Sequence, residues 1–324
     1  MDRRFWWIGA GGVLVLALGT GVAMLVLSDS GPGVRRAPAS KEGEHRLATF
    51  NVGELFDPVD DPALSGDEDD LPTPEAHLSE LARAIGAIDA DVIALQGVES
   101  ASALAWFRDT YLAELGYEHV AAIDVGHASG VENGVLSRYP LRGARVWPDM
   151  KLGATHPSGE GASVNNLAGK PVKFRRSPLL VTVELPHQGG GGVTALSLLV
   201  VELKGGDAYE YWREAEAEGV LQIAGALDER EPLVILGSFH AEPGDPSVDA
   251  LLGAGYADVL GGRGESSRWV TEVGGDRTDL ILANGSAEAL LDASGGFVLG
   301  GSFSPEPSVG AHLPVAVGVR ATWE

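Results

Sequence analysis

The chain has 324 residues, of which 44% are hydrophobic and 21% are charged, so it is long enough to bury a substantial core in one large domain or two small ones. Its 46 acidic and 23 basic residues give a net charge of −23, which repels polyphosphate backbones and argues against nucleic acid as a partner. The absence of cysteine excludes disulfides, thiolate catalysis, thiolate zinc sites and lipidated cysteine anchors.

The chain begins with a strongly apolar run over residues 5–27, which is long enough to cross a bilayer as a helix. Arg3 and Arg4 precede the run, and two tryptophans lie where an interfacial aromatic belt is found. We therefore expect a single-pass membrane anchor, with residues 1–4 in the cytoplasm and the rest of the chain in the periplasm or outside the cell. A cleaved signal peptide is the alternative, although its apolar segment is usually shorter, about 7–15 residues.

Residues 28–44 contain Ser, Gly, Pro and charges without apolar periodicity, so they are predicted to form a flexible linker. One folded domain is expected over residues 45–324. Apolar runs rich in Val, Leu and Ile, bounded by turn residues, are predicted to be its strands. These runs cover residues 46–52, 91–96, 179–185, 193–203, 233–239, 278–284 and 313–319.

Helical periodicity is found over residues 73–89, 101–115 and 209–227. In the first of these helices Thr73 is the predicted N-cap and Pro74 the first helical residue. Several strands are apolar without strict alternation, as is typical of strands covered on both faces. An α/β architecture of two packed sheets with helices outside therefore accommodates all of these segments. The apolar face of the first helix consists of Leu78, Leu81, Ile85 and Ile88.

Seven segments carry recognisable motifs. They are TFNVGELFD from residue 49, DVIALQGVES from 91, ENGVLSRYPL from 132, VVELKGG from 200, VILGSFHAEPGD from 234, DRTDLILAN from 276 and GAHLPVAVGV from 310. In this order they resemble the motifs of the endonuclease/exonuclease/phosphatase superfamily, in which the second and the last four segments read LQEVE, NHLKS, GDFN, IDHIL and SDHLPV. The resemblance implies a DNase I-like fold, a four-layered α/β sandwich with two stacked mixed β-sheets, which in this chain follows the one expected transmembrane helix.

The family hydrolyses phosphoesters with a divalent ion, usually Mg²⁺, which is held by carboxylates and polarises the phosphate. The resemblance assigns catalytic positions to Asn51, Asp279 and His312, where this chain keeps the expected residues. The remaining family positions have changed. Gly97 replaces the metal-binding Glu, Val201 and Glu202 replace the Asn and His of NHLKS, Ser238 and His240 replace the Asp and Asn of GDFN, and Ala311 replaces the Asp before the closing His.

These replacements remove the oxygen ligands that a hard cation such as Mg²⁺ requires. The loss of three carboxylates would leave little transition-state stabilisation. The sequence therefore predicts a degenerate family member, a pseudoenzyme that needs no cofactor and binds a small molecule, a glycan or another protein. The alternative is an active phosphodiesterase or phosphatase that uses Mg²⁺ or another divalent ion in a rebuilt site.

Glu99, Glu202 and His240 are the candidates for metal ligands of such a rebuilt site. Glu99 lies two residues after Gly97 on the same side of a strand, but a Glu in this position is more often a solvated strand-end or helix N-cap residue. His240, Glu202 and His312 form a second candidate set, because imidazole and carboxylate ligands suit zinc.

Two further expectations concern the catalytic remnant and its surroundings. The adjacent Arg175 and Arg176 are predicted to be solvated surface residues. Because catalytic groups act as a unit, only a combined restoration is predicted to recover turnover. That restoration combines Gly97→Glu, Ser238→Asp, His240→Asn and Ala311→Asp.

Overall fold

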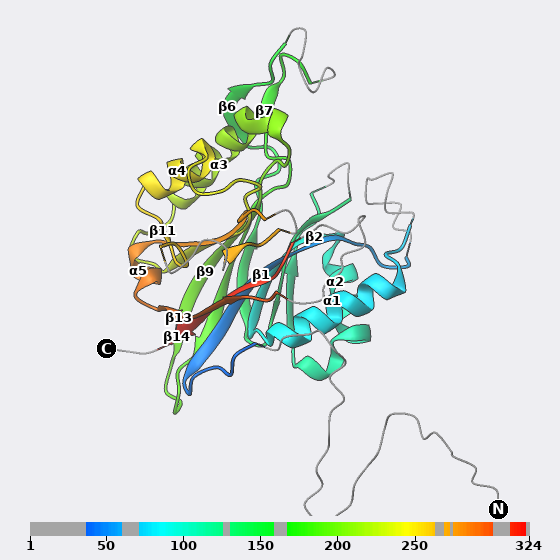
Figure 1. Cartoon of the computed structure of the whole chain (residues 1–324), viewed down its shortest axis with the longest axis vertical. Helices are drawn as coiled ribbons and strands as arrows, with labels where there is room; N and C mark the ends of the chain where they lie inside the picture. The colour runs from blue at the N-terminus through cyan, green and yellow to red at the C-terminus, as the bar shows by residue number, and fades with distance from the viewer. Residues whose placement is uncertain are drawn as a thin grey trace, which may run out of the picture.

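In the computed structural model of the protein, two six-stranded sheets lie face to face and helices cover their outer sides (Figure 1). The predicted membrane anchor, its cytoplasmic end and Ala311 lie outside the described residues. Within the part of the chain that the structure describes, no helix combines the length and hydrophobicity needed to cross a membrane. The described residues are 37–59, 71–125, 130–158, 167–262, 269–272, 275–300 and 312–321.

The first sheet contains the N-terminal and C-terminal strands of the domain. Its strands β1 and β2 are parallel, and every other neighbouring pair is antiparallel, so the sheet is mixed. The strand order is β13 (Leu291–Val298), β14 (Val315–Arg320), β1 (Glu44–Leu55), β2 (Val92–Val98), β4 (Glu132–Ser137) and β3 (His119–Ala122).

The second sheet is built in the same way, with β9 and β10 as its parallel pair and antiparallel neighbours on both sides. A small hairpin sheet of β6 (Lys151–Thr155) and β7 (Pro171–Lys173) extends beyond it. The strand order of the large sheet is β11 (Ala257–Asp258), β12 (Asp279–Ala283), β10 (Leu233–Ser238), β9 (Val193–Glu202), β8 (Leu179–Pro186) and β5 (Leu141–Arg145).

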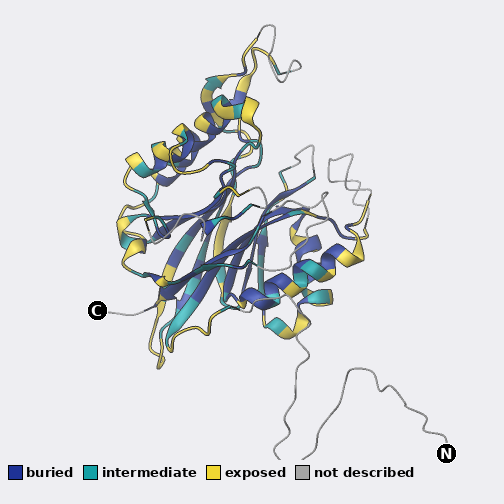
Figure 2. Cartoon of the chain, viewed as in Figure 1, coloured by how far each residue is buried: buried dark blue, intermediate teal, exposed yellow. Residues whose placement is uncertain are grey.

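Three hydrophobic cores separate four layers. One core fills the space between the sheets, one lies between the first sheet and its helices, and one lies between the second sheet and its helices. The strands are largely buried, while the outward faces of the helices are exposed (Figure 2). The predicted α/β fold of two stacked mixed sheets is therefore confirmed. The helices are α1 (Glu75–Ile88) and α2 (Ala101–Tyr111) on the first sheet, α3 (Glu210–Ala224) and α4 (Pro246–Gly253) on the second, and the short α5 (Gly285–Glu288).

Each predicted strand and helix is present, but the start of α1 differs from the prediction. The helix begins at Glu75, with Pro74 as its N-cap residue. The hydroxyl of Thr73 bonds to the end of β1 and the residue after it instead of capping the helix. It accepts the backbone N–H of Phe56 at 2.8 Å and donates to the carbonyl of Glu54 at 2.9 Å. The predicted N-cap role of Thr73 is therefore wrong, whereas the predicted apolar face of α1 is buried as expected.

The last part of the expected linker lies against the domain. The backbone N–H of Ala37 donates to the carbonyl of Ala87 at the end of α1, at 2.9 Å. Lys41 forms an ion pair with Asp292 on β13 at 2.5 Å. These contacts fix the direction in which the chain enters the domain at β1.

Candidate functional site

A continuous chain of hydrogen bonds joins the two sheets at the ends of their central strands. Asn51 donates from Nδ2 to the hydroxyl of Ser238 at 3.1 Å, and that hydroxyl donates to Oδ1 of Asp279. The second oxygen of Asp279 pairs with Nδ1 of His312 at 2.7 Å. The structure thus brings the three predicted catalytic residues together, with Ser238 as the link between Asn51 and Asp279.

Strand register explains why these residues meet. Ser238 is the last residue of β10 and lies directly opposite Asp279, the first residue of β12. The Asn51 side chain is oriented by its own Oδ1, which accepts the backbone N–H of Gly53 at 2.9 Å. The Thr271 hydroxyl accepts the backbone N–H of Asp279 at 3.0 Å and fixes the start of β12. Residues distant in sequence therefore form one buried polar cluster.

His312 is held between carboxylates. Burial alone would lower the pKa of its imidazole, but Asp279 and, more weakly, Glu272 and Glu202 raise the pKa above its usual value. Because Nδ1 is occupied by Asp279, Nε2 faces Oε1 of Glu272 at 3.8 Å. The geometry and charge of this environment favour either a protonated imidazole or a bound cation.

Sequence reasoning missed Glu272. It lies in no family motif, and it reaches the site because its backbone forms an isolated antiparallel bridge with His312. The hydroxyl of Thr278 donates to its Oε1 and orients the carboxylate. Only the tertiary pairing of two segments distant in sequence identifies this residue, so no local sequence signal could have found it.

His240 approaches the cluster from the turn after β10. Its Nε2 lies 3.7 Å from Oε1 of Glu202, and its ring packs edge-on against that of His312 with centroids 5.4 Å apart. The predicted zinc set of His240, Glu202 and His312 is brought together only in part, because the group whose ligand atoms lie within 4.8 Å of one another contains Glu272 in place of Glu202. His240 has φ of 48°, a left-handed conformation that Asn, Asp and His enter more readily than other non-glycine residues.

Glu202 is buried, with 5% of its side chain exposed, and it forms an ion pair with Arg176. Burial alone would raise the pKa of Glu202, but Arg176 and His240 outweigh burial and hold the pKa below its usual value. Arg176 is itself only 17% exposed. The prediction of a solvated surface Arg176 is therefore wrong, because β9 presents a buried carboxylate that requires a cation.

The structure places Glu99 apart from the contacts of this cluster. Only 2% of Glu99 is exposed, and its Oε2 accepts the backbone N–H of Asp57 at 2.9 Å. The N-cap of α2 is Ser100, whose hydroxyl accepts the backbone N–H of Ala103. Glu99 is therefore neither solvated nor a helix cap. It stabilises the chain after β1, and among the described contacts none joins it to His240 or Glu202.

Gly97 occupies a conformation that the family's glutamate would enter only with strain. Its φ is +86°, and the pairing of β2 is irregular between Gln96 and Val98. A Cβ added at Gly97 would lie well under 3.0 Å from the carbonyl oxygen of Gly53, a separation that real Cβ atoms essentially never show. The predicted combined restoration therefore meets a backbone clash at its first position.

The residues at the family's metal position do not fit Mg²⁺. Gly97 supplies no oxygen ligand, and the hydroxyl of Ser238 already bridges Asn51 and Asp279. Mg²⁺ requires near-octahedral oxygen coordination, usually with one or two carboxylates. The described residues at this position therefore do not support the family's Mg²⁺ chemistry.

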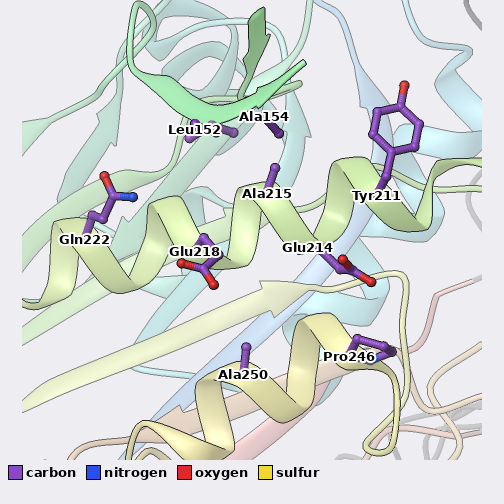
Figure 3. Close-up of a pocket in the computed structure, with 10 residues that line it drawn as sticks. Leu152, Ala154, Tyr211, Glu214, Ala215, Glu218, Gln222, Pro246 and Ala250 are labelled. Carbon is purple, nitrogen blue, oxygen red and sulfur yellow. The ribbon is translucent and has the colours of Figure 1, made fainter. Parts of the chain in front are cut away.

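A separate open groove of about 520 Å³ lies between β6, α3 and α4 (Figure 3). Glu214 and Glu218, one turn apart on α3, line it together with Leu152 and Ala154 of β6 and Ala250 of α4. The groove contains none of the predicted catalytic residues. Its carboxylates give it an acidic character.

A two-sheet α/β sandwich whose strand ends bring an Asn, an Asp and a His together defines a DNase I-like protein. Residues 48–305 match the model of the Endonuclease/Exonuclease/phosphatase family, so the chain belongs to this family. No curated protein matches the sequence.

Solved structures of the same fold share little sequence with this chain. Humanized D. rerio TDP2 is 15% identical with a TM-score of 0.53, and the match covers 85% of this chain and 98% of that one. The 3' phosphatase NExo from Neisseria, bound to a product DNA hairpin, is 16% identical with a TM-score of 0.51 and coverages of 86% and 100%. The human Nocturnin catalytic domain is 15% identical, with a TM-score of 0.51 and coverages of 90% and 96%. Identities this low establish the fold alone.

Proposed function

We propose that this chain is a membrane-anchored member of the family that binds a ligand and does not hydrolyse phosphoesters with Mg²⁺. The observation that carries the proposal is the position of Ser238. Where the family motif has an aspartate, the Ser238 hydroxyl donates to Asp279 and accepts from Asn51. The position therefore holds a neutral group with both hydrogen-bonding roles filled.

The remaining groups do not replace the lost chemistry. Both oxygens of Asp279 are occupied, one by Ser238 and one by His312. A serine hydroxyl is not a carboxylate base at neutral pH. An imidazole paired with a carboxylate has no developing charge to stabilise unless a phosphate is polarised nearby. The retained residues then support the structure of the site.

This proposal predicts a null rate in a simple assay. The purified full chain should hydrolyse bis(p-nitrophenyl) phosphate in Mg²⁺ or Mn²⁺ no faster than its His312→Ala variant, because the family's carboxylate ligands are missing at Gly97 and Ser238. Release of p-nitrophenol gives the rate. Turnover that exceeds that of the variant roughly tenfold or more and disappears with a chelator would contradict the proposal.

The second candidate function is a divalent-metal-dependent phosphodiesterase or phosphatase with a rebuilt site. It is favoured by the retention of Asn51, Asp279 and His312, because Asp279 pairs directly with His312 and is joined to Asn51 through Ser238. Phosphatase activity in structural neighbours such as the Neisseria 3' phosphatase is compatible with it. The same assay separates the two functions, since only the second predicts rates that depend on metal and on His312.

The proposed ligand is a small molecule, a glycan or a protein. The net charge of −23 disfavours nucleic acid, and Glu214 and Glu218 extend the negative charge into the groove beside α3. A neutral or cationic ligand is therefore favoured at that surface over a phosphate backbone.

The anchoring part of the proposal rests on the apolar run at residues 5–27 and on the arginines that precede it. Protease added to sealed spheroplasts should digest the domain, because the positive-inside rule places it outside the cytoplasm. An antibody against the C-terminus would follow the digestion, with a cytoplasmic protein as the control for sealing. Full protection of the domain until detergent is added would reverse the orientation.

A further inference from the structure

Three side chains with metal-binding atoms converge beside the Ser238 network. A nitrogen of His240, a nitrogen of His312 and a carboxylate oxygen of Glu272 all lie within 4.8 Å of one another. Zinc with bonds of about 2.0–2.1 Å to nitrogen and oxygen places tetrahedral ligand atoms roughly 3.3 Å apart. The 3.8 Å separation of His312 Nε2 and Glu272 Oε1 exceeds that spacing by roughly 0.5 Å, and the other ligand atoms, which lie within 4.8 Å, must approach by at most roughly 1.5 Å.

Hydrogen bonds from neighbouring residues already orient two of the three side chains, those of His312 and Glu272. Asp279 accepts a hydrogen bond from Nδ1 of His312 when the imidazole is in the neutral form that binds metals, which leaves Nε2 as the ligand atom. A carboxylate behind a histidine is the usual support of a zinc ligand in proteins. Thr278 donates to the carboxylate of Glu272. The cluster therefore has both the ligands and the groups that fix their direction.

His240 is held in this place at a conformational cost. Its backbone is left-handed, with φ of 48°, a conformation that is unfavourable for a non-glycine residue. Strained residues of this kind concentrate at ligand-binding and catalytic sites. The side chain is 22% exposed, so an ion has access to the cluster from solvent.

The charges around the cluster also favour a divalent cation. Asp279, Glu272 and Glu202 supply three carboxylates, and Arg176 supplies one neutralising guanidinium. Oε2 of Glu202 is buried and has no hydrogen-bond partner among the described residues. The three carboxylates outnumber the single guanidinium, and a divalent ion would balance this excess of negative charge.

We propose that His240, Glu272 and His312 bind a zinc-class divalent ion. The zinc site deepens the proposed function, because it names a ligand for the site around His312. It rests on the proposed function only in the assumption that this site binds a ligand. Two imidazoles and one carboxylate select zinc or cobalt over Mg²⁺, which prefers oxygen ligands. Three protein ligands leave the fourth position of a tetrahedral ion open.

The test uses the full chain, purified in mild detergent and stripped with a chelator. After equilibration with ZnCl₂ and dialysis, elemental analysis should find one zinc per chain, and Co²⁺ should give the visible absorption of a tetrahedral ion. His240→Asn and Glu272→Gln should each lower zinc affinity roughly tenfold or more in competition with a chromophoric chelator. His119→Gln, on edge strand β3, is the matched control and should bind like the wild type.

Several results would overturn the site. These are the absence of stoichiometric zinc in the wild type, an octahedral Co²⁺ spectrum, or equal affinity in the wild type and a folded His240→Asn variant. Circular dichroism verifies that each variant is folded, and the wild-type spectrum alone decides the case if both variants fail to fold. Hydrolysis supported by zinc would overturn the proposed function but not the zinc site. The absence of zinc binding would overturn the zinc site but not the proposed function.

Discussion

Gly97→Ala is expected to lower the free energy of unfolding by about 3 kcal/mol. The left-handed φ of +86° costs an alanine about 1–2 kcal/mol. Its Cβ would also overlap the carbonyl oxygen of Gly53, and overpacking of this kind costs about 1–3 kcal/mol in addition. Urea unfolding of the full chain in detergent, followed by tryptophan fluorescence, measures the loss.

Gly143→Ala provides the control for this prediction. Gly143 on β5 has a similar φ of +69°, but an added Cβ there would meet no heavy atom within 4 Å. Its loss should therefore be limited to the conformational cost of about 1–2 kcal/mol. Equal losses at the two positions would show that the backbone around Gly53 relaxes. Gly97→Glu would then become a feasible restoration after all.

The clash at Gly97 shows which properties of the fold and the site can be predicted from sequence and which cannot. Strands such as β9 and β10 carry long apolar runs with turn residues at their ends, so their formation follows from local pattern. The close approach of Gly97 to Gly53 depends on an irregularity between β1 and β2 that no local pattern encodes. The sequence shows that Gly97 stands where the family motif has a glutamate. The strain of restoring that glutamate depends on the tertiary contact with Gly53.

Glu272 and Arg176 are two further residues whose contacts could not be predicted from local sequence. Both belong to segments without a family motif, and the sequence suggested surface exposure for the arginine. Tertiary pairing brings Glu272 beside His312 and Arg176 beside Glu202. Charged residues are rarely buried unless they are paired, so the identity of Glu202 on a central strand was the hint that a cation must lie close by.

The Ser238 network explains how the fold accommodates a serine where the family motif has an aspartate. An aspartate at this position would place a second negative charge within hydrogen-bonding distance of Asp279, and two such carboxylates do not ionise together without a cation. Serine removes that repulsion and keeps a hydrogen bond to each sheet through Asn51 and Asp279. A serine at this position is therefore compatible with a hydrogen-bonded arrangement that needs no cation between Ser238 and Asp279.

The ion pair of Arg176 and Glu202 is expected to contribute strongly to the stability of the domain. Arg176→Met should lower the free energy of unfolding by about 3–5 kcal/mol, because it leaves the carboxylate of Glu202 buried and unpaired. The side chains are 17% and 5% exposed, so solvent screens the pair only weakly. Chemical denaturation at neutral pH measures the loss.

Two comparisons separate the pair from a general charge effect. Arg142→Met breaks an ion pair with Glu184 in which the arginine is 71% exposed, so it should cost no more than about 1 kcal/mol. Arg176→Met combined with Glu202→Gln should recover much of the lost stability, because the uncompensated charge is gone. A loss below about 1 kcal/mol for Arg176→Met in metal-free protein would contradict the prediction, because the buried carboxylate of Glu202 would then not depend on Arg176 for its stability.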